Sequence, residues 1–413
     1  MKNWQEMKAG NRLRVLNLIR QRPIPRSEVA KETGLTRAAI SLIAGGLESE
    51  GLIVESGQRE SALGRRPILL ELQPRYAYSL GMTISRTGAE VGVCDLTGQL
   101  LCRIPVDIEG ATRPQAIRRL KKALEKLLHE YKPDKGRWLG LGISTPGPVD
   151  IATGTILNPP NFEFWQGTCI CAEARGIGLQ QVFLENISQS LTMAEKAYGV
   201  GRNRQKFVLV LVEAGVGGGI VLGDKLNSGW RGFGSEIGHT SIDQNGPRCA
   251  CGLRGCVELY ASVPLVLEAA REFHPRLKTW RDFIDLAETG DRPCKNLLER
   301  QSRALGTAIV NLLNILEPDA VVLAGDILYK GEQLRAGIES FVAEHAINRR
   351  LRRVPVHLSP LGERPQLMAA AEIVTEKFFQ GDLKPETLHV PSRPGSAGAS
   401  RVVSRRSDVG CRD

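Results

Sequence analysis

Three cysteines and one histidine lie close together in the sequence and could bind a metal ion. Cys249, Cys251 and Cys256 fall within eight residues, and His239 precedes them by one short loop. Three thiolates and one imidazole suit tetrahedral zinc, and four protein ligands are typical of a structural rather than a catalytic site. Two glycines between the cysteines would let the chain wrap around the ion. We therefore predict a structural Zn²⁺ site; the alternative is a loop with three reduced cysteines.

A second group of residues, near the N-terminus, could bind DNA. The spacing of apolar residues predicts a helix over 11–21, a short helix over 28–33 and a third helix from 36 to about 50. A turn at Gly34 joins the last two helices, which is the helix-turn-helix pattern. Small side chains at the exposed start of the last helix would let it approach the major groove. We predict DNA contacts from Thr36, Arg37, Ala38 and Ser41; the alternative is an ordinary helical hairpin.

A basic loop follows these helices. The predicted strands 51–55 and 68–72 flank a loop that ends in Gly64-Arg65-Arg66-Pro67. Next to a helix-turn-helix such a loop is a wing, and Arg65 and Arg66 could enter a narrow minor groove, where the negative potential is enhanced. The alternative is a solvated basic hairpin. Residues 1–75 are therefore predicted to form a winged helix-turn-helix domain.

The composition agrees with a soluble protein that binds nucleic acid. The chain has 413 residues, enough for two or three domains, and its net charge of +10 suits a partner that carries phosphates. No apolar run reaches the roughly 18–20 residues that span a bilayer, and the N-terminus has no signal-peptide pattern. Nine cysteines, an odd number, do not suggest a disulfide framework. We expect a cytoplasmic protein without a membrane partner.

The rest of the chain alternates between strand-like and helical patterns. Strands are predicted over 78–84, 89–95, 138–144, 181–184, 207–212 and 320–324. Helices are predicted over 113–131, 189–198, 264–273 and 303–316. This alternation predicts an α/β domain over 76–380. Residues 381–413 are rich in Ser, Arg, Gly and Pro without periodicity, so we predict a disordered tail there.

At the cysteine cluster the sequence resembles a known family. The run Gly234-Ser-Glu-Ile-Gly-His239, followed by Cys-x-Cys-Gly-x-x-Gly-Cys-x-Glu258, is similar to the signature of the ROK family (repressors, open reading frames and kinases). The resemblance covers residues 10 to about 380, and the helix-turn-helix indicates the repressor branch. It implies an actin-like ATPase fold of two lobes with a sugar cleft between them, and a homodimer or homotetramer.

The resemblance also implies sugar-binding residues. The loop that ends in Asn161 looks like a cleft loop of the family, with Asn161 contacting a sugar hydroxyl. Glu236, His239 and Glu258 match the family's sugar-binding acids and histidine, and Asn186 matches a cleft asparagine. Carboxylates suit hydroxyl-rich ligands because they accept charge-assisted hydrogen bonds. The alternative for the two glutamates is a helix cap or a surface acid.

Two elements that a kinase of this family needs are replaced. In the first phosphate loop, Thr83 stands in place of the acid, and Ser85 and Arg86 stand in place of two glycines. The catalytic aspartate would follow Asn186, but that position is Ile187, which cannot accept a proton. An alignment shifted by one residue would place Asn186 there, and asparagine is not a base either.

A third kinase element is changed but keeps its glycines. The second phosphate loop corresponds to 214–219, where the hydroxyl is lost and the preceding Glu213 would repel phosphate. These changes predict a sensor rather than an enzyme. We predict a transcriptional regulator, most simply a repressor of carbohydrate genes, that binds double-stranded operator DNA and responds to a sugar or sugar derivative. The alternatives are a regulator controlled by a protein partner and an ATP-dependent sugar kinase with a DNA-binding arm.

Overall fold

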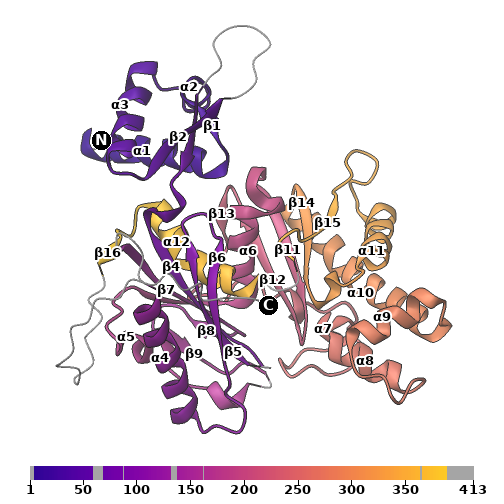
Figure 1. Ribbon diagram of the computed structural model, residues 1–413. Coiled ribbons are helices and arrows are strands. Elements are labelled where there is room, and N and C mark those ends of the chain that lie inside the picture. Colours follow the sequence, from indigo (N-terminus) through magenta and orange to yellow (C-terminus); the bar gives the residue numbers. More distant parts are fainter. Residues whose placement is uncertain are drawn as a thin grey trace.

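The computed structural model describes residues 4–58, 68–86, 88–131, 137–160, 162–362 and 365–387. Arg65, Arg66 and Asn161 lie outside these described residues, as do residues 388–413 of the predicted tail. The described chain forms an N-terminal domain above a larger body of two lobes (Figure 1). No helix among the described residues is long and apolar enough to cross a membrane.

The N-terminal domain has the predicted winged helix-turn-helix fold. Its elements are α1 (Trp4–Gln21), β1 (Ile24–Pro25), α2 (Arg26–Thr33), α3 (Arg37–Ser49), β2 (Ile53–Gln58) and β3 (Ile68–Leu72). The three strands form one antiparallel sheet in the order β1-β3-β2. Val15, Val29, Ile40 and Leu70 are fully buried and join the three helices to the sheet.

The first lobe is built on a mixed sheet in the order β10-β7-β4-β5-β6. Its elements are β4 (Tyr78–Ile84), β5 (Ala89–Asp95), β6 (Leu100–Val106), α4 (Arg113–Glu130), β7 (Arg137–Thr145), β8 (Val149–Asp150), β9 (Thr155–Ile156), α5 (Ile170–Arg175) and β10 (Val182–Asn186). The first three strands are an antiparallel meander, whereas β4, β7 and β10 are parallel. The short strand β16 (Glu386–Thr387) pairs with β7, so the segment predicted as a disordered tail begins with a paired strand.

The second lobe contains a five-stranded sheet in the order β13-β12-β11-β14-β15. Its elements are α6 (Ile187–Tyr198), β11 (Lys206–Val212), β12 (Val216–Leu222), β13 (Lys225–Leu226), α7 (Glu258–Ala261), α8 (Val263–Arg271), α9 (Trp280–Thr289), α10 (Arg292–Leu316), β14 (Ala320–Gly325), α11 (Glu332–His345) and β15 (Val356–Leu358). The two lobes together confirm the predicted α/β sugar-kinase-like architecture.

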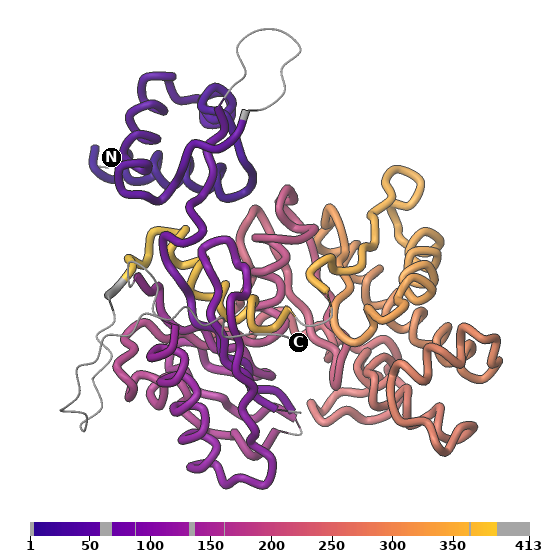
Figure 2. Tube along the Cα trace, viewed as in Figure 1, coloured from indigo at the N-terminus to yellow at the C-terminus, as the bar shows by residue number. Residues whose placement is uncertain are grey.

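One helix near the C-terminus connects the parts of the molecule. Helix α12 (Gln366–Gln380) packs on β4, β7 and α6, and it lies directly beneath the N-terminal domain (Figure 2). Two glycines of the first sheet allow this close packing. A Cβ atom at Gly81 would lie 2.4 Å from the carbonyl oxygen of Leu367, and one at Gly142 would lie 1.8 Å from that of Ala370.

Candidate functional site

The start of α3 presents the predicted DNA-contacting residues to solvent. Gly34 adopts a left-handed conformation, with φ 70°, which lets the chain turn sharply after α2. The Thr36 hydroxyl accepts a hydrogen bond from the Ala39 backbone N–H at 3.2 Å and so caps α3. Thr36, Arg37, Ala38 and Ser41 are all exposed. The sequence reasoning missed Leu42, which is 73% exposed on the same face and offers an apolar contact for a thymine methyl group.

The arginine on this face differs from other arginines of the N-terminal domain in having no ion pair. Arg12, Arg22 and Arg26 each form ion pairs with glutamates of the same domain. Within the described part of the chain, by contrast, the Arg37 side chain has no ion pair or hydrogen bond. An unpaired guanidinium beside small side chains is suited to a phosphate or a guanine edge.

The cysteine–histidine cluster comes together as a metal-ligand set. One ligand atom from each of His239, Cys249, Cys251 and Cys256 lies within 4.8 Å of the others. The Cys249 Sγ is 3.6 Å from the His239 Nδ1, and the Cys251 Sγ is 3.5 Å from the Cys256 Sγ. Zinc–sulfur bonds of about 2.3 Å in a tetrahedron place sulfur atoms about 3.8 Å apart, so the cluster fits an ion of this size.

The local fold explains how the chain reaches this geometry. A short 3₁₀ helix, Ile237–His239, presents the histidine, and the cysteines follow on a tight loop. Gly255 has φ 64°, and a Cβ atom there would lie 1.8 Å from the Asp243 carbonyl oxygen, so only glycine fits. The backbone N–H of Leu253 favours the thiolate of Cys251 and lowers the pKa of that thiol.

Three of the predicted sugar ligands, Glu236, His239 and Glu258, are close enough to interact electrostatically. Burial raises the pKa of the Glu236 carboxyl; His239 opposes this shift and the nearby Glu258 adds to it. Glu258 is the first residue of α7, and its Oε2 accepts a hydrogen bond from the Val216 N–H at 3.0 Å. These side chains therefore face a common region between β12 and the metal-ligand loop.

Asn186 is the N-cap residue of α6. Its Oδ1 accepts hydrogen bonds from the backbone N–H and the hydroxyl of Ser188, at 3.0 and 3.1 Å, so it caps the helix. Gln189 Nε2 donates to the Gly234 carbonyl at 2.9 Å and joins this helix end to the loop that carries Glu236. Asn161, the remaining predicted sugar ligand, lies outside the described residues.

The glycines of the predicted second phosphate loop have a packing role. They form strand β12, which pairs with β11 in a hairpin. A Cβ atom at Gly218 would lie 2.1 Å from the Ile237 side chain, and one at Gly219 would lie 1.8 Å from the Thr192 hydroxyl oxygen. These two glycines therefore let α6 and the 3₁₀ helix pack on the strand. This packing explains the glycines without a bound phosphate.

The surroundings of this hairpin are acidic. Burial and the nearby Asp326 raise the pKa of the Glu213 carboxyl to about 7, although Gln366 donates a hydrogen bond to it at 3.3 Å. Arg86, which the family resemblance aligned with a phosphate-loop glycine, donates from Nη2 to the Pro160 carbonyl at 2.8 Å. It thereby joins the turn after β4 to the loop before Asn161.

A buried charged cluster attaches the N-terminal domain to the body. Arg20 of α1 forms ion pairs with Glu372 and, at 2.7 Å, with Glu376, both on α12. The Tyr198 hydroxyl at the end of α6 donates to the other oxygen of Glu372 at 2.5 Å. The Arg20 guanidinium also stacks 4.1 Å above the Phe379 ring. Helix α6 thus starts beside the predicted sugar site and ends at the cluster that holds α1.

Comparison with known proteins identifies the family. The sequence model of the ROK family matches residues 79–377, more than half of the chain. The chain belongs to the ROK family. It is 28% identical to the xylose repressor of Bacillus subtilis over 90% of this chain and 96% of that protein. It is 29% identical to the glucokinase of Thermotoga maritima over 72% of this chain and 98% of the kinase.

A solved structure supports the same conclusion. The crystal structure of a ROK family transcriptional regulator, described as a homologue of the E. coli Mlc protein, superposes with a TM-score of 0.75. The two share 25% identity, over 91% of this chain and 98% of the other. The ROK match begins after the N-terminal domain and the kinase match covers 72% of this chain, whereas the repressor and regulator matches cover about 90% of it. The similarity beyond the ROK body is therefore to regulators.

Proposed function

We propose that this ROK protein is a DNA-binding transcriptional regulator, most simply a repressor of carbohydrate genes. One observation carries the proposal: an exposed α3 start, with an unpaired Arg37, on a winged helix that precedes a ROK body. Thr36, Arg37, Ala38 and Ser41 would contact base edges and phosphates in the major groove. Arg65 and Arg66 would follow the adjacent minor groove. A homodimer or homotetramer would place two such helices on a palindromic operator.

The effector would be a sugar or sugar derivative. Asn161, Asn186, Glu236, His239 and Glu258 are the proposed ligands for its hydroxyl groups. His239 would bind zinc through Nδ1, the atom that faces Cys249, and keep its other ring nitrogen for the sugar or for a neighbouring group. The Zn²⁺ ion, held by His239 and the three cysteines, would be structural, because four protein ligands leave no open position.

The kinase alternative is disfavoured by Ile187, the residue that the family resemblance aligns with the catalytic aspartate. Ile187 is the first residue of α6 and packs against the apolar cluster around β11. Asp326 and the partly ionised Glu213 would add negative charge beside the second phosphate loop that the family resemblance implies. We expect no transfer of phosphate from ATP to any hexose. Phosphorylation of a hexose by the purified protein would favour the kinase instead.

The test compares two arginine variants in binding to the DNA upstream of the protein's own gene. Arg37→Gln should weaken specific binding by about 1–3 kcal/mol, the value of a good bidentate base contact. Arg276→Gln is the matched control, because Arg276 is exposed in the distant lobe and has no hydrogen bond or ion pair with another described residue. An affinity of Arg37→Gln equal to that of the wild-type protein would remove Arg37 from the interface, and an equal loss in both variants would indicate only a general charge effect.

A further inference from the structure

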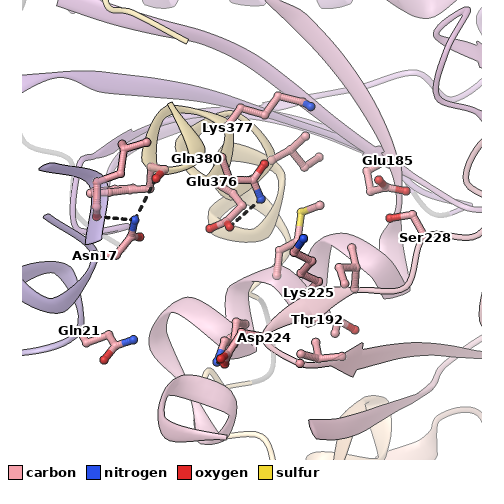
Figure 3. Close-up of a pocket in the computed structure, with 18 of the residues that line it drawn as sticks. Asn17, Gln21, Glu185, Thr192, Asp224, Lys225, Ser228, Glu376, Lys377 and Gln380 are labelled. Atoms are coloured by element: carbon pink, nitrogen blue, oxygen red, sulfur yellow. Dashed lines mark hydrogen bonds and ion pairs between the residues drawn. The ribbon is translucent and has the colours of Figure 1, made fainter. Parts of the chain in front are cut away.

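A pocket of about 940 Å³ lies between the N-terminal domain and the body, outside the proposed sugar site. Figure 3 shows residues of both parts around it. Helix α1 contributes Asn17 and Gln21, and helix α12 contributes Lys377 and Gln380. The opposite wall comes from α6 and from the segment around β13, including Lys225 and Ser228. Volumes of about 300–1,000 Å³ are typical of small-molecule sites.

The charges on the walls do not balance one another. Four acids line the pocket, and three of them have partners: Glu32 pairs with Arg22, Asp224 with Lys196, and Glu376 with Arg20. The fourth acid, Glu185, forms no ion pair within the described residues. It is 4% exposed, and its Oε1 accepts only the Asn186 backbone N–H, at 3.0 Å. Burial raises the pKa of this carboxyl to about 7, so near neutral pH it carries only part of a negative charge.

The bases on the walls are less well compensated. Neither Lys225 nor Lys377 has an ion pair with any residue that the structure describes. Lys377 instead lies 4.9 Å above the Phe183 ring, and Arg14 donates to the Thr33 carbonyl at 3.0 Å. Arg14, Lys225 and Lys377 thus line the pocket without an ion pair among the described residues, and of these only Lys377 acts on Glu185, where it lowers the pKa of the carboxyl against the effect of burial. The pocket therefore favours an anionic occupant.

The remaining wall atoms suit a ligand that also carries hydroxyl groups. Gln21 and Ser228 make no side-chain hydrogen bond with another described residue and are free to donate or accept. Leu13 and Met193, which are partly buried, supply apolar surface to the same pocket. A few polar groups on a partly apolar wall are typical of sites that orient a small molecule.

We propose that this pocket is a second ligand site, specific for a sugar-sized molecule with a phosphate or carboxylate group. Lys225 and Lys377 bind the anionic group, and Gln21 and Ser228 bind hydroxyl groups. Because α1 forms one wall, the ligand contacts the N-terminal domain and the body at once. A ligand that binds more tightly to one placement of α1 shifts the recognition helix toward that placement, and by linkage operator DNA changes the affinity for the ligand. This coupling rests on the proposed function, whereas ligand binding itself does not.

The test is isothermal titration calorimetry of the full-length protein at fixed salt. The probes are glucose 6-phosphate, 6-phosphogluconate, glucose and inorganic phosphate. We expect one phosphorylated or carboxylated probe to bind at least tenfold more tightly than glucose and than inorganic phosphate. Lys225→Gln combined with Lys377→Gln should weaken that binding at least tenfold. Lys278→Gln, an exposed lysine in the other lobe, should leave it unchanged.

Several results would overturn the proposal. These are no preference for an anionic sugar, equal binding of inorganic phosphate, or loss of binding in Glu258→Gln but not in the lysine variant. Hydrogen exchange gives a second readout that does not depend on a variant: the ligand should protect 13–21 and 373–380 in the wild-type protein. Calorimetry and exchange do not require DNA, so failure of the proposed DNA binding would not be mistaken for failure of this site.

Discussion

Replacing Arg20 by methionine should loosen the attachment of the N-terminal domain to the body. The Arg20 side chain is 9% exposed and that of Glu372 is fully buried, so the change leaves a carboxylate without its partner in a dry environment. Removing one member of a buried ion pair costs about 3–5 kcal/mol. Arg22 offers a matched control, because its side chain is 41% exposed and its ion pairs lie on the surface. Arg22→Met should cost less than about 1 kcal/mol.

The pH dependence of this loss follows from Glu372. Burial already raises the pKa of this carboxyl to about 7, with Arg20 opposing the shift, so loss of Arg20 raises it further. At pH 6 this carboxyl is mostly protonated with or without Arg20, whereas at pH 8 it is mostly ionised in the wild-type protein and gains from Arg20, so the cost of Arg20→Met should be larger at pH 8 than at pH 6. Adding Glu372→Gln removes the unpaired charge and should restore most of the stability.

The assay is urea unfolding of the single and double variants at both pH values. The reasoning is refuted if Arg20→Met costs no more than Arg22→Met, or if Glu372→Gln does not rescue it. Rescue is the informative result, because a purely steric effect of methionine would persist in the double variant.

Three further predictions concern other parts of the structure. Burial raises the pKa of Glu185 from its ordinary 4.5 to about 7, so its contribution to stability is fully present below pH 4.5 and is lost as the pH rises through 7. Glu185→Gln should therefore raise the free energy of unfolding by about 3 kcal/mol at pH 8 and hardly at pH 5. An equal effect at the two pH values would contradict this. The protein should contain one zinc per chain by elemental analysis and melt at a lower temperature after chelation or in Cys256→Ser; zinc-free protein with an unchanged melting temperature would exclude a structural site. Gly142→Ala should destabilise the protein by about 3 kcal/mol, because the new Cβ would meet the Ala370 carbonyl oxygen. Gly10 has open space around it, so Gly10→Ala should stabilise the protein by up to about 1 kcal/mol. Similar effects of the two substitutions would refute the packing argument.

Local patterns in the sequence predicted many elements of the fold. The strands over 78–84 and 89–95 agree with β4 and β5 to the residue, because short apolar runs are bounded there by polar turns. Helix α2 was less well placed: it was predicted to begin at residue 28, but it begins at Arg26, after Pro25. Pro25 is extended and its ring fixes φ, so it holds the residue that precedes the helix in a conformation outside the helical region.

Features that depend on distant residues could not be predicted in this way. The Arg20–Glu372 ion pair joins residues 352 positions apart, and nothing near either one indicates the other. Helix α12 was absent from the predicted elements. It packs against the sheet, α6 and α1, so most of its own residues are buried and it lacks the polar face that marks an amphipathic helix. The glycines of β12 were interpreted as a phosphate loop because glycine runs serve both turns and close packing, and only the neighbours Thr192 and Ile237 distinguish the two.

The central claim is that a small molecule controls operator binding by this protein. Fluorescence anisotropy with the DNA upstream of its own gene, at one fixed salt concentration and with a panel of sugars and sugar phosphates, tests it most directly. The account predicts binding to this DNA at least about a thousandfold tighter than to scrambled DNA, and one compound of the panel that shifts the affinity. Specific binding that no compound shifts would favour a protein partner as the signal, and equal binding to scrambled DNA would contradict the account.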